Sequence, residues 1–149
     1  NQAVIAGNTE AVDRAVELLS GVAKKVIKLK VSAPFHCALM KPAQEKLAAD
    51  LERLEFKEPA MPVVTNVDAR ATMAPDELRD ALVRQVSAPV RWVDSMQLLV
   101  AQSVGTFVEA GPGKVLSGLM RQINRDAKTL NVEDAASLEA TNAALAAGD

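Results

Sequence analysis

The sequence predicts an α/β fold, because segments with the period of a strand alternate along the chain with segments with the period of a helix. Residues 27–31 alternate apolar and lysine side chains, which is typical of a half-buried strand. Residues 106–110, Thr-Phe-Val-Glu-Ala, are a strand candidate that passes through Gly111-Pro112-Gly113 into a helical stretch. From His36 onwards this alternation predicts a parallel sheet with helices on its faces.

The first segment of the chain predicts a compact strand–helix–strand unit. Residues 2–6 are an apolar strand candidate, and apolar residues at helical spacing then recur as far as Leu19, with Gly21 as a stop signal. The strand at 27–31 completes the unit. We expect residues 1–31 to belong to a different and smaller layer than the rest of the chain.

The remaining residues predict a loop followed by five helices and three strands. Residues 32–36 are a loop candidate, since Pro34 cannot donate to a central ladder. In the helix that begins at Pro75, four apolar side chains are expected to face inward, namely Leu78, Ala81, Leu82 and Val86. The expected helices are 39–54, 75–88, 92–100, 114–124 and 135–147, and the expected strands are 63–67, 106–110 and 130–132.

The composition is that of an ordinary globular protein and excludes several functions. The 149 residues are 49% hydrophobic and 24% charged, with a net charge of -2, so nothing draws the chain generally towards nucleic acid or anionic lipid. Aromatic residues make up only 3%, which disfavours base-stacking platforms. We see no membrane-spanning run and no secretory signal. Because the chain starts with Asn1 inside an apparent strand, we expect a fragment or a processed piece.

His36 is the only histidine and Cys37 the only cysteine. Histidine titrates near neutral pH and is the usual general base, but the sequence pattern alone favours an unreactive surface or buried side chain, since a single histidine specifies no chemistry. A Cys–His nucleophilic pair is disfavoured, because neighbouring side chains in an extended segment point to opposite faces. A single cysteine permits no intrachain disulfide and predicts a reducing, cytoplasmic location.

Two other features, a glycine-rich turn and a lysine cluster, each have two interpretations. Gly111-Pro-Gly-Lys114 is either a tight strand-to-helix turn or a place where free N–H groups hold an anion, and it lacks the phosphate-loop spacing. A cluster of lysines is either the wet face of a strand or a dock for an acidic partner; its members are Lys24, Lys25, Lys28 and Lys30. No metal is expected, since zinc needs three or four convergent ligands.

Residues 32–42, Ser-Ala-Pro-Phe-His-Cys-Ala-Leu-Met-Lys-Pro, strongly resemble the histidine motif of the malonyl-CoA:acyl carrier protein transacylases of bacterial type II fatty acid synthesis. Further segments resemble the same family in the same order, and several motifs in one order are more specific than any single motif. These segments are 2–7, 62–68, 80–85, 89–92 and 109–116. The chain therefore resembles the C-terminal half of that family over nearly its whole length.

The resemblance implies an α/β-hydrolase-like large subdomain with a ferredoxin-like small subdomain inserted in it. Residues 1–31 would be the C-terminal part of the small subdomain, and residues 32–149 the C-terminal part of the large, parallel-sheet acyltransferase subdomain. This division agrees with the pattern of strands and helices.

The resemblance also implies an activity: transfer of a malonyl group from coenzyme A to the phosphopantetheine thiol of acyl carrier protein, through an acylated serine. His36 matches the general base, and Gln85 matches the residue whose backbone carbonyl orients that histidine. Phe35 matches a position where a bulky side chain favours malonyl over branched acyl groups. Lys24 and Lys25 are candidates for docking the carrier protein. The resemblance implies no cofactor or metal, and no nucleic acid or membrane partner.

The family's G-H-S-x-G serine elbow is absent from these residues. The malonyl-binding arginine would also come from the missing N-terminal half, and three arginines here do not match it, namely Arg79, Arg84 and Arg91. Alternative interpretations are the acyltransferase domain of a polyketide or fatty-acid synthase, a non-catalytic carrier-protein-binding fragment, and a hydrolase. The reason for the absence of that half, the acyl selectivity beyond malonyl and the oligomeric state do not follow from the sequence.

Overall fold

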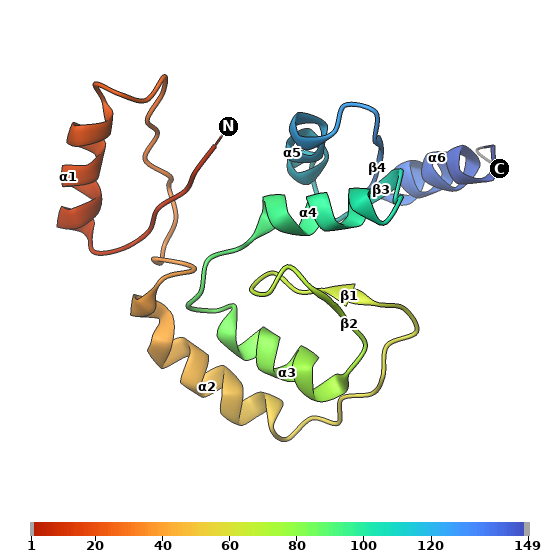
Figure 1. Cartoon of the computed structure of the whole chain (residues 1–149), viewed down its shortest axis with the longest axis horizontal. Coiled ribbons are helices and arrows are strands. Elements are labelled where there is room, and N and C mark those ends of the chain that lie inside the picture. The colour runs from red at the N-terminus through yellow and green to blue at the C-terminus, as the bar shows by residue number, and fades with distance from the viewer. Residues whose placement is uncertain (1, 148–149) are drawn as a thin grey trace. The chain divides into compact units, whose positions relative to one another are not determined.

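A computed structural model describes residues 2–147, which divide into two compact units (Figure 1). One unit is Gln2–Trp92 and the other begins at Val93. Helices and strands are mixed and one pair of strands is parallel, which confirms the α/β class. The division expected after residue 31 is a different one, and it stays a prediction. No helix within residues 2–147 combines the length and the apolar composition needed to cross a membrane.

Helix α1 (Thr9–Leu19) forms where the spacing of apolar residues predicts it. Val12, Ala15 and Val16 are its half-buried residues, and they lie one helical turn apart. At the end of the helix the Ser20 hydroxyl donates to the Val16 carbonyl at 2.6 Å. The helix ends at Leu19 with Ser20 as its C-cap, just before the predicted stop at Gly21.

The strands expected at residues 2–6 and 27–31 are not formed, and those predictions are wrong. No described residue pairs with either segment in a β-ladder. Their apolar side chains are exposed, with 57% of Ile5 and 62% of Ile27 accessible to solvent. An alternating pattern predicts a strand only where a neighbouring strand completes the hydrogen bonds and a second layer covers the apolar face.

Two helices pack together in the first unit. A short 3₁₀ helix (Ala38–Met40) leads into α2 (Lys41–Leu51), which contacts α3 (Pro75–Arg84). Both helices end earlier than expected, because i→i+3 hydrogen bonds tighten their last turns. Ala81 is buried as predicted, at 2% exposure, but Leu82 is 39% exposed, so its predicted inward orientation is wrong.

A hairpin lies between these helices in sequence. Strand β1 (Val63–Val64) pairs antiparallel with β2 (Ala71–Thr72). Strand β1 is shorter than the expected strand 63–67, and β2 was not expected. The turn closes where the Thr65 N–H donates to the Arg70 carbonyl at 3.3 Å and the Ala69 N–H donates to the Thr65 carbonyl at 2.9 Å.

The second unit is built on a parallel pair of strands. Helix α4 (Trp92–Ala101) leads to β3 (Thr106–Ala110), which pairs in parallel with β4 (Lys128–Val132). Helix α5 (Val115–Ile123) connects the two strands, and α6 (Ala135–Ala146) packs against β4. The parallel arrangement expected from His36 onwards is confirmed for β3 and β4, but it is wrong for β1, which pairs antiparallel with β2 in a separate sheet. Strand β4 is longer than the expected strand 130–132. The buried apolar residues among the described part of this unit are Met120, in α5, and Ala127, just before β4.

The turn from β3 into α5 is held by a carboxylate. Glu109 accepts hydrogen bonds from the main-chain N–H groups of Leu116 at 3.0 Å and Ser117 at 2.8 Å, and from the Ser117 hydroxyl at 2.7 Å. Gly111 and Gly113 have φ angles of 137° and 87°, which only glycine adopts easily. The hydrogen bonds from Ser117 are the main reason that the pKa of Glu109 lies below its usual range.

We expect Glu109→Gln to lower the melting temperature at pH 7, because the neutral amide loses the charge-assisted bonds to the first turn of α5. A carboxylate whose pKa is lowered in the folded state stabilises the protein above the ordinary glutamate pKa of about 4.3, and that stabilisation is lost as the pH falls. The difference between the two proteins should therefore shrink by pH 3 in thermal unfolding. Glu139→Gln, at an exposed position on α6, is the control. Equal melting temperatures at pH 7 would contradict this account.

Candidate active site

His36 and Gln85 are brought together within the first unit. The Nδ1 atom of His36 lies 3.0 Å from the main-chain oxygen of Gln85, although 49 residues separate the two in sequence. Since a carbonyl oxygen can only accept, Nδ1 carries the hydrogen in the neutral ring. The other ring nitrogen, Nε2, then has its lone pair free to take a proton. The imidazole is exposed, so this nitrogen is accessible.

The backbone of His36 is in the left-handed region, with a φ of 60°. A side-chain-bearing residue in this region costs about 1–3 kcal/mol and is found disproportionately at functional sites. The residues just before His36 form a tight turn, in which the Phe35 N–H donates to the Ala33 carbonyl at 2.9 Å. The sequence carried no signal for this conformation.

The Gln85 carbonyl is available because of its place at the end of a helix. Gln85 is the C-cap of α3, and its own N–H donates to the Ala81 carbonyl at 3.0 Å. The last carbonyls of a helix have no partner inside the helix, and the helix dipole makes that end negative. A ring N–H is thus attracted to this position without any carboxylate.

Two further hydrogen bonds lie close to this contact in sequence. The Ser87 hydroxyl donates to the side-chain oxygen of Gln44, which joins the segment after α3 to α2. The Cys37 thiol donates to the Pro34 carbonyl at 3.1 Å. The thiol is half-buried and is not hydrogen-bonded to the neighbouring His36 ring among the described residues, which disfavours a Cys–His pair.

An ion pair precedes Gln85 in the chain. The Arg84 guanidinium donates two hydrogen bonds to the Asp68 carboxylate, at 3.0 and 2.8 Å, and its Nε donates to Asp80 at 2.6 Å. The hydrogen bonds from Arg84 are the main cause that holds the pKa of Asp68 below its usual range, and the pKa of Arg84 is raised in return. Sequence reasoning missed this pair, although the turn-forming residues around Asp68 were a signal for the hairpin that carries it.

The other predicted site residues have no contact that assigns them a role. Phe35 lies beside His36 with 48% of its surface exposed. Lys24 and Lys25 are exposed after α1. Lys28, from the same cluster, forms an ion pair with Asp13 at 2.6 Å. The proposed roles of these residues in selectivity and docking stay predictions.

The Gly111–Lys114 turn has little capacity left for an anion. The Gly113 N–H donates to Glu133 at 2.8 Å, and the first N–H groups of α5 donate to Glu109. Acidic side chains of the chain itself thus occupy the donors that a bound anion would use. Of the two interpretations, the structure favours the tight turn.

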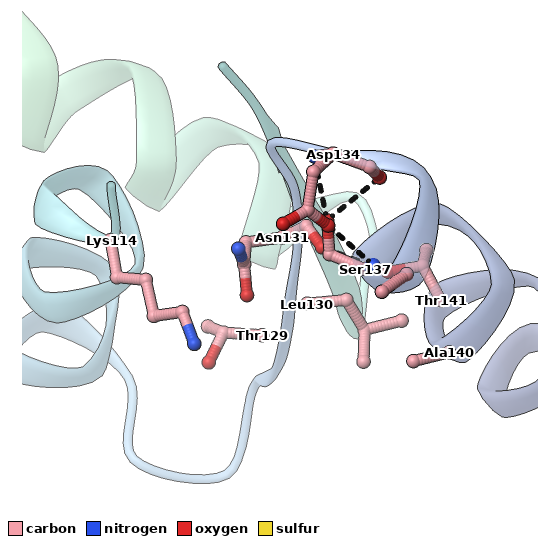
Figure 2. Close-up of a pocket in the computed structure, with 9 residues that line it drawn as sticks. Lys114, Thr129, Leu130, Asn131, Asp134, Ser137, Ala140 and Thr141 are labelled. Atoms are coloured by element: carbon pink, nitrogen blue, oxygen red, sulfur yellow. Dashed lines mark hydrogen bonds between the residues drawn. The ribbon is translucent and has the colours of Figure 1, made fainter. Parts of the chain in front are cut away.

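An open pocket lies in the second unit beside β4 and α6 (Figure 2). Lys114, Asp134 and Ser137 are among its polar lining residues. Asp134 is the N-cap of α6 and accepts from the Ser137 N–H at 2.8 Å, so its carboxylate is engaged in capping (Figure 2). Within residues 2–147 no group of three or more histidine, cysteine, aspartate or glutamate side chains is arranged to hold a metal ion.

Comparison with known proteins gives consistent matches. The chain is 50% identical over 123 residues to the malonyl CoA-acyl carrier protein transacylase of Escherichia coli K12, a match that covers 82% of this chain and 40% of that protein. A crystal structure of an acyl carrier protein S-malonyltransferase from Vibrio cholerae is 46% identical with a TM-score of 0.85, and the match covers 91% of this chain and 44% of that one.

A third match is a complex of a type II polyketide synthase acyl-carrier protein with its malonyl-transacylase. It is 46% identical with a TM-score of 0.83, over 89% of this chain and 43% of that chain. No protein-family model matches the chain. The chain thus spans less than half the length of the proteins it matches, and by these similarities it is homologous to a part of the malonyl CoA-acyl carrier protein transacylases.

Proposed function

We propose that this chain is the histidine-bearing part of an enzyme that moves a malonyl group from coenzyme A to the phosphopantetheine thiol of acyl carrier protein. The observation that carries the proposal is the 3.0 Å contact between His36 Nδ1 and the Gln85 carbonyl. It supplies an oriented base, and the relatives that share this stretch are named for the same reaction.

In the first half-reaction His36 Nε2 takes the proton of a serine hydroxyl while the serine oxygen attacks the thioester carbonyl. The C–S bond then breaks, and the imidazolium returns the proton to the departing coenzyme A thiolate. In the second half-reaction Nε2 takes the proton of the phosphopantetheine thiol, and the sulfur attacks the serine ester. The C–O bond breaks and the serine oxygen recovers the proton, so the cycle leaves His36 unchanged.

The serine belongs to a segment outside these 149 residues, which hold no G-H-S-x-G sequence. The same segment would supply the arginine that pairs with the malonyl carboxylate. Phe35 beside His36 would narrow the acyl site against an α-methyl branch. A reducing cytoplasm suits a protein with one free thiol, Cys37.

The carrier protein is proposed as the macromolecular partner. One relative is recorded in a complex with an acyl-carrier protein. Lys24 and Lys25 are exposed cations on the unit that carries His36, and opposed charge speeds the encounter with an acidic protein.

A second candidate function is carrier-protein binding without transfer. Binding of the carrier protein with no malonyl transfer by the full-length protein would support it over the enzyme.

We expect His36→Ala in the full-length protein to reduce malonyl transfer by about 10²–10⁴-fold, because the serine loses its base. Transfer is measured with malonyl-CoA and a holo carrier protein, and circular dichroism checks folding. Cys37→Ala is the matched control, since among residues 2–147 its thiol bonds only to the Pro34 carbonyl in the same loop, and it should keep transfer within about twofold of wild type. Near-normal turnover by His36→Ala would remove the base assignment.

We expect reversal of Lys24 and Lys25 to Glu to raise the KM for carrier protein several-fold and leave the KM for malonyl-CoA almost unchanged. The reason is that rim charges act on the encounter with a charged protein rather than on the chemistry. Lys57→Glu, an exposed charge reversal in the same unit, is the control. Equal changes in both KM values would contradict a docking role.

A further inference from the structure

We propose that Asn66 is a positioning residue for His36, acting through Gln85. The inference rests on the proposed function, because the reaction it affects is the transfer that His36 assists. Asn66 lies in the turn between β1 and β2, and the whole hairpin, residues 63–72, is called the positioning hairpin below.

Asn66 holds the residue whose carbonyl orients the imidazole. Its Nδ2 donates to the side-chain oxygen of Gln85 at 2.9 Å. The main-chain oxygen of the same Gln85 faces His36 Nδ1 at 3.0 Å, and its N–H is bonded to Ala81. Gln85 is therefore restrained through its side chain, its N–H and its carbonyl at once.

The positioning hairpin also holds the chain on both sides of Gln85. On one side Asp68 receives two hydrogen bonds from Arg84. On the other side the Arg91 N–H donates to the Asn66 carbonyl at 2.8 Å, and Arg91 Nη1 donates to the Asp68 carbonyl at 2.9 Å. The segment from 84 to 91 is thus attached to the hairpin at both ends and at Gln85.

The hairpin is itself fixed to the beginning of α3. Glu77, in the first turn of that helix, accepts from Thr72 Oγ1 at 2.5 Å and from Arg70 Nη2 at 2.8 Å. With Arg84 at the other end of α3, the hairpin is bonded near both ends of the helix. The hairpin is therefore held to α3 at two places, and it can fix the position of Gln85 at the C-terminal end of this helix.

The restraint on Gln85 matters because its carbonyl sets the orientation of the His36 ring. Among the described residues, the Gln85 carbonyl is the one protein partner of the imidazole, and the ring is otherwise exposed. A small displacement of that oxygen lets the ring rotate, and misplacement of a reacting group by about 1 Å can cost 10²-fold in rate. Asn66 touches no reacting atom, so its effect should appear in kcat and not in the binding of either substrate.

The test uses the full-length protein with Asn66→Ala, Gln85→Leu and the double variant. Gln85→Leu removes the side-chain acceptor and leaves the main-chain carbonyl in place. Each single variant should lower kcat about five- to tenfold, the worth of one hydrogen bond, with KM for malonyl-CoA changed less than about twofold. Because both remove the same contact, the double variant should be no slower than either single variant.

Asp76→Asn is the matched control, because it breaks an exposed ion pair with Arg79 in the first turn of the same helix and should leave kcat unchanged. An unchanged kcat in Asn66→Ala, or effects that multiply in the double variant, would overturn the proposal. So would a fall in kcat matched by an equal rise in KM, which indicates general damage.

A crystal structure of Asn66→Ala provides a readout that does not depend on turnover. The distance from His36 Nδ1 to the Gln85 oxygen should lengthen beyond hydrogen-bond range, about 3.5 Å. An unchanged distance would refute the positioning role. His36→Ala, assayed in parallel, separates the two hypotheses. Normal transfer by that variant would contradict the proposed function. The positioning role of Asn66 is decided instead by the His36–Gln85 distance in Asn66→Ala and by the kcat of the double variant.

Discussion

The hydrogen bond from the His36 ring to the Gln85 carbonyl joins two segments that are distant in sequence, and the chemistry proposed for the chain depends on it. Its acceptor is a helix-terminal carbonyl, which is neutral and cannot take the proton away from Nδ1. The hydrogen bond favours the tautomer that carries its hydrogen on Nδ1, so Nε2 is the ring nitrogen that would take and return a proton in the proposed half-reactions.

The part of the site that short sequence motifs carry could be predicted. His36 and the Gln85 main chain followed from motifs that resemble a family, and the structure brings those two residues together. The left-handed backbone of His36 and the Asn66–Gln85 contact could not be predicted, because each depends on how the loop and the hairpin meet α3 in space. Contacts between segments 19 or 49 residues apart leave no periodic trace in one sequence.

The fold, too, could be predicted where it is encoded locally and not where it depends on contacts between distant segments. Helix α1, with its apolar residues at helical spacing and the Gly21 stop signal just after it, is encoded locally and was predicted well. The strands expected at 2–6 and 27–31 need partner strands, and no described residue supplies them. Leu82 was placed inward on periodicity, yet one helical face is covered only where another element packs on it, and 39% of this side chain remains exposed.

Acidic side chains hold the helix starts of the second unit through hydrogen bonds from main-chain N–H groups. Glu109 and Asp134 each accept main-chain N–H groups at a helix start, which makes these helix starts poor anion sites. The proposed chemistry therefore lies in the first unit, where the His36 imidazole is exposed and its Nε2 has no hydrogen-bond partner among residues 2–147.

The most direct test of this account is the tautomer of His36 in the full-length protein. With ¹⁵N-labelled histidine at pH 8, and the His36 signals identified by their loss in His36→Gln, the account predicts a protonated Nδ1 and an unprotonated Nε2. A ring protonated at Nε2, or one that averages between both forms, would show that the Gln85 carbonyl does not orient the base.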